Sequence, residues 1–156
     1  MYEIIAKEKL APGIQHMKVM APLVARKAMP GQFIILRVME GGERIPLTIA
    51  YSLPEAGLIA IIVQEIGVTT MKIGRLSAGD EILDLVGPLG VPSEIELFGT
   101  VVCVGGGVGI AALYPIAKAL QDKGNEVISI LGARSDEFII MRQEMEAGTS
   151  KCLYST

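Results

Sequence analysis

The first 97 residues alternate short apolar runs with turn-forming residues about every ten positions. Runs rich in Ile and Val end at turns that contain glycine or proline, at 11–13, 30–31, 41–42, 54–57 and 79–80. This spacing is typical of a small antiparallel β barrel or sandwich. Leu58 to Val63 is continuously apolar and predicts a central strand. Thr69 to Leu76 predicts one or two helical turns, with Thr69 or Thr70 as the N-cap.

After Gly99 the pattern changes to strands that alternate with helices. Buried-strand patterns occur at 100–104 and 126–131, a helix-length segment at 110–123, an amphipathic segment at 136–147, and the start of a third strand at 151–156. This βαβαβ order predicts a parallel, doubly wound sheet. We therefore expect an antiparallel barrel over residues 1–97 and a parallel α/β domain over 98–156. Three parallel strands are half of the usual unit, so we expect the second domain to be truncated.

Composition narrows the classes of function. The chain has 156 residues, which suffice to bury about 70% of the unfolded surface. Hydrophobic residues make up 51% and the mean hydropathy is +0.49, so we expect a partner to cover part of the surface. The net charge of −3 shows no basic excess that would favour nucleic acid.

Targeting and redox signals favour an intracellular protein. The N-terminus lacks the charged start and apolar run of a signal peptide. Residues 97–117 carry no charge, but their glycines and Pro115 fit a buried strand, a turn and a helix better than a membrane span. Cys103 and Cys152 are isolated in apolar contexts, which indicates free thiols in a reducing, cytoplasmic compartment.

Arg44 and Thr48 form the first candidate site. Arg44 comes just before a predicted strand, and residues four apart on a strand point to the same face. An arginine fork suits a diphosphate, and a hydroxyl further along suits a ring carbonyl or nitrogen. The alternative is an edge-strand arginine beside a threonine that merely favours β structure. Residues 67–70 could add backbone N–H groups at a helix start, as an anion site.

A glycine cluster forms the second candidate site. Gly105, Gly106, Gly107 and Gly109 follow a strand and open a helix, the context in which a pyrophosphate binds. The spacing is not a clean GxGxxG because Ile110 takes the last glycine position, so a tight strand-to-helix crossover remains the alternative. Arg134, after the next strand, could reach a ribose or phosphate or could be a solvated surface residue.

Other chemistry has little support in the sequence. His16 is the only histidine and lies in a β run, which favours a strand-surface residue over a catalytic base. Two cysteines cannot supply the four thiolates of an iron–sulfur centre. We therefore predict no side-chain catalyst and no metal site.

The segments RIPLTIA (44–50), QEIGVTT (64–70), VGPLG (86–90) and VGGGVGIA (104–111) together resemble the ferredoxin–NADP reductase superfamily across the whole chain. Within it, the chain is similar to the small flavin-carrying subunit of NADH-dependent ferredoxin:NADP oxidoreductase, also called sulfide dehydrogenase. The electron-transfer subunit of dihydroorotate dehydrogenase is the near relative. Ala112 stands where relatives often carry a proline.

The resemblance implies an FAD-binding barrel at 1–97 and the N-terminal half of a nicotinamide nucleotide-binding domain at 98–156. Arg44 would hold the FAD pyrophosphate, Pro46, Leu47 and Thr48 would pass the isoalloxazine ring, and Gly67, Thr69 and Thr70 would complete the phosphate cradle. The glycine cluster and Arg134 would receive NAD(P)H. A [2Fe–2S] cluster is expected only in the missing C-terminal part, so this stretch alone is expected to be inactive.

The expected function is flavin-dependent electron transfer between NAD(P)H and an iron–sulfur or flavoprotein partner. The expected partners are a larger oxidoreductase subunit and ferredoxin, with self-association of this stretch as a further outcome. One alternative is the electron-transfer subunit of dihydroorotate dehydrogenase. An alternative of another class is a non-catalytic interaction module that has lost its cofactor.

Overall fold

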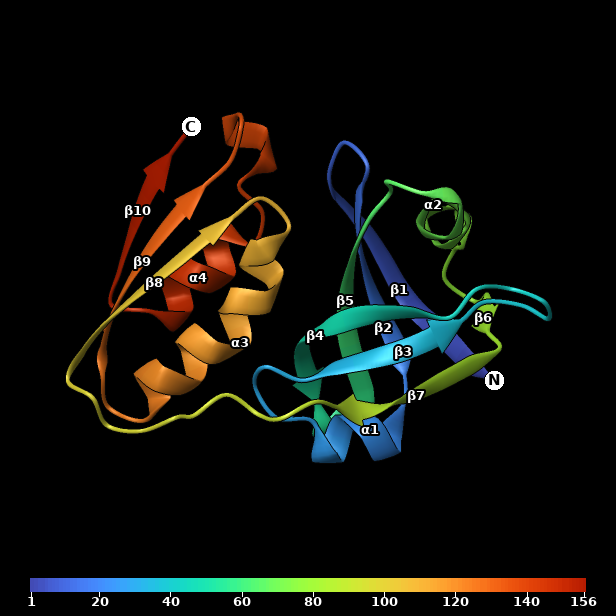
Figure 1. Cartoon of the computed structure of the whole chain (residues 1–156), viewed down its shortest axis with the longest axis horizontal. Coiled ribbons are helices and arrows are strands. Elements are labelled where there is room, and N and C mark those ends of the chain that lie inside the picture. The colour runs from blue at the N-terminus through green and yellow to red at the C-terminus, as the bar shows by residue number, and fades with distance from the viewer. The chain divides into compact units, whose positions relative to one another are not determined.

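The computed structural model describes all 156 residues, which divide into two compact units, Met1–Pro92 and Ser93–Thr156 (Figure 1). The division falls in the segment 91–98, which forms neither helix nor strand. The boundary expected from the sequence, after residue 97, lies in the same segment. No helix of the structure has both the length and the apolar character needed to cross a membrane.

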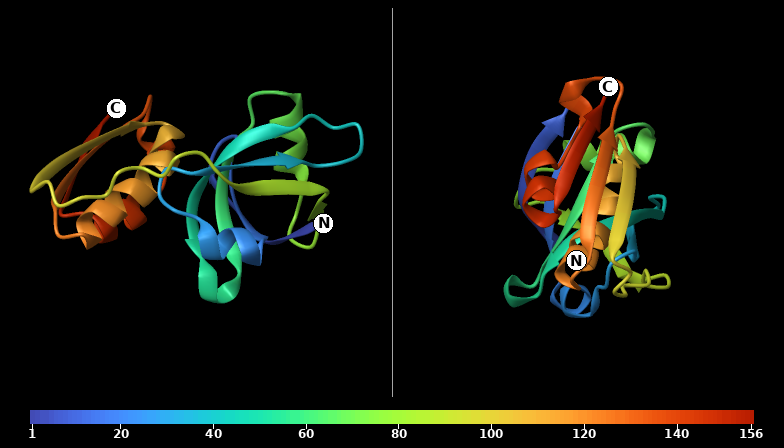
Figure 2. Two further views of the ribbon diagram at one scale, coloured as in Figure 1. Left: turned by 60° about the horizontal axis from the view of Figure 1, so that its bottom comes forward. Right: turned by 90° about the vertical axis from the view of Figure 1, so that its left-hand side faces the viewer.

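The first unit is an antiparallel sheet that curves into a nearly closed barrel, as the turn spacing predicted (Figure 2). Its strands are β1 (Tyr2–Ala11), β2 (Ile14–Met20), β3 (Phe33–Arg37), β4 (Ile45–Leu53), β5 (Leu58–Gln64), β6 (Glu81–Ile82) and β7 (Asp84–Leu89). The order is β6-β1-β2-β5-β4-β3-β7. Only Leu83 separates β6 from β7, and its N–H donates to the carbonyl of Val38 at 3.1 Å. The two ends of the sheet are therefore joined through one residue.

Strand β5 has the central position predicted for it, between β2 and β4. Its alternate residues Ile59, Ile61 and Val63 belong to the barrel core. Ala60 and Ile62 are also buried, on the opposite face of the strand. Burial on both faces explains why the sequence of this strand is continuously apolar rather than alternating.

Three short helical elements complete the first unit: α1 (Pro22–Lys27), η1 (Pro54–Ala56) and α2 (Val68–Arg75). The predicted capping of α2 by Thr69 or Thr70 is wrong, because Gly67 is the N-cap. Thr70 lies inside the first turn, and its Oγ1 accepts hydrogen bonds from the N–H groups of Ile66 at 3.0 Å and Gly67 at 2.9 Å. The threonine hydroxyl thus stabilises the chain that enters the helix.

The second unit is a parallel sheet with helices, as the βαβαβ order predicted. Its elements are β8 (Thr100–Gly106), α3 (Gly109–Asp122), β9 (Glu126–Gly132), η2 (Asp136–Phe138), α4 (Arg142–Gly148) and β10 (Lys151–Ser155), and the strand order is β10-β9-β8. Helices α3 and α4 cover one face of the sheet (Figure 1). Cys103 and Val127 are buried, whereas Val102 and Val104 are exposed.

The continuous helix predicted over 136–147 is wrong. The short 3-10 helix η2 ends at Phe138, and α4 begins only at Arg142. Between them Ile139, Ile140 and Met141 are all buried, and Met141 has the left-handed φ of 54°. Three consecutive residues of a helix point to different faces, so a regular helix packed on one face could not bury all three.

Candidate cofactor-binding sites

The strand β4 places Arg44 and Thr48 on the same side. Ile45 and Leu47 pack against the barrel core and Ile49 belongs to it, so these three side chains point inward. The alternation of a strand then places Arg44, just before β4, with Pro46 and Thr48 on the outer face. Leu47 therefore offers no side chain to a cofactor on that face. Pro46 is exposed and Thr48 is half-buried.

The start of α2 lies beside the segment that carries Arg44. Thr69 Oγ1 donates a hydrogen bond to Glu43 Oε2 at 2.6 Å. The first N–H groups of a helix have no intrahelical partner. The N–H of Gly67 is already bonded to Thr70, so the unpaired donors begin at Val68. A Cβ on Gly67 would meet only Thr70 Oγ1, at 4.0 Å, so the space in front of this turn is open.

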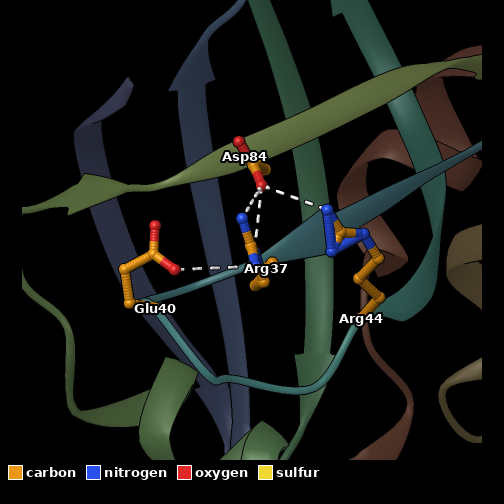
Figure 3. A network of polar contacts seen from close by, with 4 residues as sticks. All are labelled: Arg37, Glu40, Arg44 and Asp84. Atoms are coloured by element: carbon orange, nitrogen blue, oxygen red, sulfur yellow. Dashed lines mark hydrogen bonds and ion pairs between the residues drawn. The ribbon is translucent and has the colours of Figure 1, made fainter.

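Arg44 also belongs to a network of charges with Arg37, Glu40 and Asp84 (Figure 3). Arg37 on β3 contacts Asp84 Oδ2 through Nε at 2.9 Å and Nη2 at 2.5 Å. Arg44 Nη2 reaches the same oxygen at 3.4 Å, and Arg37 Nη1 lies 3.9 Å from Glu40 Oε2. The Arg44 side chain is 55% exposed, against 21% for Arg37. Arg44 therefore presents most of its guanidinium to solvent.

The end of the VGPLG segment and Thr48 flank β3 on opposite sides, where Leu89 and Thr48 both pair with Phe33. Residues 86–89 end strand β7, which pairs with β3, whereas Thr48 is on β4. Strand β3 thus separates the two segments. A Cβ on Gly87 would lie 2.7 Å from Ile34 Cγ2, and one on Gly90 would lie 2.9 Å from the Phe33 ring. These glycines permit close packing on β3.

In the second unit the glycine cluster lies at the carboxyl end of β8, the edge at which open α/β sheets bind ligands. Gly107 donates its N–H to the carbonyl of Gly132 at 2.9 Å. A Cβ on Gly105 would lie 2.8 Å from Leu113 Cδ2, so this glycine allows α3 to approach the strand. A Cβ on Gly107 or Gly109 would meet nothing within 4 Å, and one on Gly106 only Gly132 O at 3.8 Å. Those three glycines border open space.

Arg134 follows the neighbouring strand β9, two residues after the carbonyl that Gly107 contacts. Its guanidinium carbon lies 4.1 Å from the centre of the Phe138 ring. This stacking holds the cation in place while the residue stays exposed. Arg134 is therefore available at the same edge of the sheet as the glycine cluster.

Each unit offers groups that fit a diphosphate. In the first unit these are an exposed arginine, unpaired N–H groups at a helix start and open space at Gly67. In the second they are three glycines beside open space at a strand-to-helix turn, with an exposed arginine on the next strand. No group of three or more His, Cys, Asp or Glu side chains lies close enough together to hold a metal ion.

The charge network that Arg37 and Asp84 form with Arg44 could not be predicted from the sequence. Both are ordinary charged residues in their local sequence, and they meet because β3 and β7 pair with Arg37 opposite Asp84. Only the register between the two strands would have shown this.

Sequence comparison finds relatives among electron-transfer proteins, although no family model matches the chain. A Thermotoga maritima protein named as a homologue of the electron transfer subunit of NAD-dependent dihydroorotate dehydrogenase B is 50% identical over 144 residues, which are 92% of this chain and 51% of the relative. The electron transfer subunit from Enterococcus faecalis is 34% identical over 152 residues, 94% of this chain and 57% of that protein. The chain spans about half the length of these relatives.

A solved structure of an NADH-dependent reduced ferredoxin–NADP oxidoreductase matches with a TM-score of 0.95 and 47% identity, over 99% of this chain and 56% of that one. The chain therefore has the two-unit fold of ferredoxin–NADP reductases, a barrel followed by a parallel α/β sheet. Ferredoxin–NADP⁺ reductase from Plasmodium falciparum, at 16% identity, matches with a TM-score of 0.79 over 98% of this chain and 68% of that one. At that identity the likeness shows the superfamily fold alone.

Proposed function

We propose that this chain is the flavin- and nicotinamide-binding part of an electron-transfer subunit. It would move electrons between NAD(P)H and an iron–sulfur or flavoprotein partner. The observation that carries this is the 2.6 Å hydrogen bond from Thr69 to Glu43, the residue before Arg44, which joins the start of α2 to the segment that carries Arg44. An exposed cation and unpaired N–H groups thus lie on two joined segments of a barrel with the fold of ferredoxin–NADP reductases.

Each candidate residue has a role in this proposal. Arg44 binds the diphosphate of FAD through charge-assisted hydrogen bonds, and the N–H groups at Val68 to Thr70 bind it at the helix start. Thr48 and Pro46, on the same face as Arg44, line the position of the flavin ring. Leu47 supports them from the core side.

The second unit would bind the nicotinamide nucleotide. Gly106, Gly107 and Gly109 leave room for the close approach of a pyrophosphate to the backbone, and Gly105 keeps α3 close to β8. Arg134 would contact the ribose or a phosphate. The bound cofactors supply hydride acceptance and single-electron release, and the protein binds and orients them.

The proposed function includes a protein partner and a cellular location. The named relatives favour the electron-transfer subunit of dihydroorotate dehydrogenase, and the solved structure favours a ferredoxin-linked oxidoreductase. A larger oxidoreductase subunit is the expected partner in both. The two free cysteines favour a cytoplasmic location and cannot by themselves ligate a [2Fe–2S] cluster. Since the relatives are about twice as long, we infer that these residues alone do not complete the electron-transfer cycle.

The test is FAD affinity in an Arg44→Ala variant, measured by quenching of flavin fluorescence. Loss of a charge-assisted hydrogen bond worth roughly 1.5–3 kcal/mol should weaken binding about tenfold or more. Arg134→Ala is the control, because that arginine lies in the other unit and should leave FAD affinity unchanged. Equal affinity of Arg44→Ala and the parent chain would refute the assignment.

A further inference from the structure

The carboxylate of Asp84 has two arginine partners that it holds unequally. Arg37 contacts Oδ2 through two nitrogens, at 2.9 and 2.5 Å. Arg44 contacts the same oxygen through one nitrogen at 3.4 Å, a distance at which a hydrogen bond is weak. The carboxylate is therefore anchored by Arg37, and Arg44 is attached loosely.

The strand pairing explains why both arginines meet one acid. Arg37 lies directly opposite Asp84 in the β3–β7 ladder. On the other side of β3, Leu36 pairs with Ile45, which places Arg44 next to Arg37 at the same end of the sheet. Two neighbouring guanidinium groups repel each other, and Asp84 between them relieves that repulsion (Figure 3).

We propose that Asp84 is the resting partner of Arg44, which Arg44 leaves when a diphosphate binds while Arg37 keeps the carboxylate in place. Asp84 and Arg37 are then positioning residues that set how readily Arg44 is released. This inference rests on the proposed function, in which Arg44 binds the FAD diphosphate. The exchange costs little, because an exposed ion pair with a single contact contributes little to stability.

Substitutions at Asp84 and at Arg37 should change FAD affinity in opposite directions. Asp84→Asn removes the competing carboxylate and should tighten FAD binding about two- to fivefold at low salt, the range expected of an exposed ion pair. The gain should shrink in about 1 M salt, where charges are screened within about 3 Å. Arg37→Gln frees Asp84 to hold Arg44 closely and should weaken FAD binding by a similar factor.

Glu40→Gln is the matched control. It removes one negative charge from the same network, but Glu40 contacts Arg37 at 3.9 Å and no contact joins it to Arg44. A general rise in positive potential would tighten binding equally in Glu40→Gln and Asp84→Asn. Release of Arg44 tightens binding in Asp84→Asn and leaves Glu40→Gln close to the parent chain.

A double variant separates indirect from direct action of Arg37. If Arg37 acts through Asp84, Arg37→Gln should change FAD affinity little once Asp84→Asn is present. If Arg37 itself binds phosphate, Arg37→Gln should weaken FAD binding both with and without Asp84→Asn. That result would overturn the proposal. Should Asp84→Asn not fold, as judged by circular dichroism, Arg37→Gln alone carries the test, and unchanged or tighter binding overturns the proposal.

The Arg44→Ala variant distinguishes a failure of this inference from a failure of the proposed function. If Arg44→Ala leaves FAD affinity unchanged, the assignment of Arg44 itself fails. If Arg44→Ala weakens FAD binding but Asp84→Asn fails to tighten it, only the exchange fails. Asp84→Asn combined with Arg44→Ala should match Arg44→Ala alone, and tightening in that background would also overturn the exchange.

Discussion

At the scale of single residues, Ser129 is the one buried side chain whose polar atom has no hydrogen-bond partner. It lies on β9 between Cys103 of β8 and Cys152 of β10 and has no exposed surface. An unsatisfied buried hydroxyl carries a desolvation penalty of about 1–3 kcal/mol. Ser129→Ala should therefore raise the free energy of unfolding in urea by about 1 kcal/mol.

Ser150→Ala is the control for that measurement. The Ser150 hydroxyl donates to Gln121 Oε1 at 2.7 Å, so its loss should lower stability slightly. If Ser129→Ala lowers stability as Ser150→Ala does, the Ser129 hydroxyl has a partner and the description of this strand is wrong.

The two cysteines should differ in reactivity. Burial raises the pKa of the Cys103 thiol above its ordinary value of 9.0. Cys103 is buried, whereas Cys152 is half-buried. Only the thiolate reacts, so alkylation at pH 8 should be at least about tenfold slower at Cys103 than at Cys152. Mass spectrometry of iodoacetamide-treated protein measures both rates, and equal rates would contradict the burial of Cys103.

The same shift predicts how stability changes at alkaline pH. A thiol with a raised pKa in the folded protein ionises first in the unfolded chain. Its contribution to stability is therefore present below about pH 9 and is lost as the pH rises further. Cys103→Ala should make the decline of the unfolding free energy above pH 9 shallower. An unchanged slope in that variant would assign the decline to other groups.

The placement of a residue was predictable from the sequence where it follows from the local strand pattern. Arg44 and Thr48 share a face because strand alternation follows from the sequence of β4. Asp84 and Arg37 were not predictable, because their meeting depends on the register of strands far apart in the chain. The VGPLG segment shows the same limit, since only strand order reveals that β3 lies between it and Thr48.

At the scale of elements, Asn125 joins the end of α3 to the chain that leads into β8. Its Oδ1 accepts hydrogen bonds from the N–H groups of Phe98 at 2.6 Å and Gly99 at 2.9 Å. Its Nδ2 donates to the carbonyls of Glu96 and Leu120, both at 2.8 Å. Asn125 is buried, so these four backbone groups have no easy replacement partner.

Asn125→Ala should therefore lower the free energy of unfolding by roughly 3 kcal/mol, because several buried polar groups lose their partners together. Lys123→Ala is the control: Lys123 is exposed at the end of the same helix and should change stability by less than about 0.5 kcal/mol. Urea titration of both variants checks the prediction. A loss under about 1 kcal/mol for Asn125→Ala would mean that water replaces the amide.

Elements with one regular pattern were predictable, and elements with a broken pattern were not. The strand β5 and the helix α3 follow directly from their apolar spacing. The short helix α1 was missed, although Pro22 occupies its start, because six residues are too few for a periodic signal. The segment 136–147 has amphipathic spacing, but the need to bury Ile139, Ile140 and Met141 together overrides it.

At the scale of the whole molecule, the proposed FAD and nicotinamide sites lie in separate units, so a substitution in one site should leave the other intact. Gly106→Val fits a β strand, since a Cβ there meets nothing closer than 3.8 Å, yet its side chain fills the space proposed for a nucleotide. It should weaken binding of NADH about tenfold or more, the range expected when a charged phosphate loses a hydrogen bond, and leave FAD affinity unchanged. Isothermal titration with each cofactor measures both.

Arg44→Ala supplies the reciprocal control, with FAD affinity reduced and NADH affinity unchanged. If either variant weakens the binding of both cofactors equally, the assignment of one site to each unit is wrong.

The order of the two units was predictable because the hydrophobic period changes after Gly99. The function proposed for each unit rests on the superfamily resemblance, since a glycine turn alone does not distinguish a nucleotide site from a tight crossover.

FAD binding by the barrel can be measured by titrating the flavin-free chain with FAD. We expect saturable binding of one FAD per chain, with quenched flavin fluorescence and a shifted visible spectrum. Binding should persist in Arg134→Ala and Gly106→Val, whose changes lie in the second unit. An absence of saturable FAD binding to the folded chain would overturn the proposed function and favour a module that has lost its cofactor.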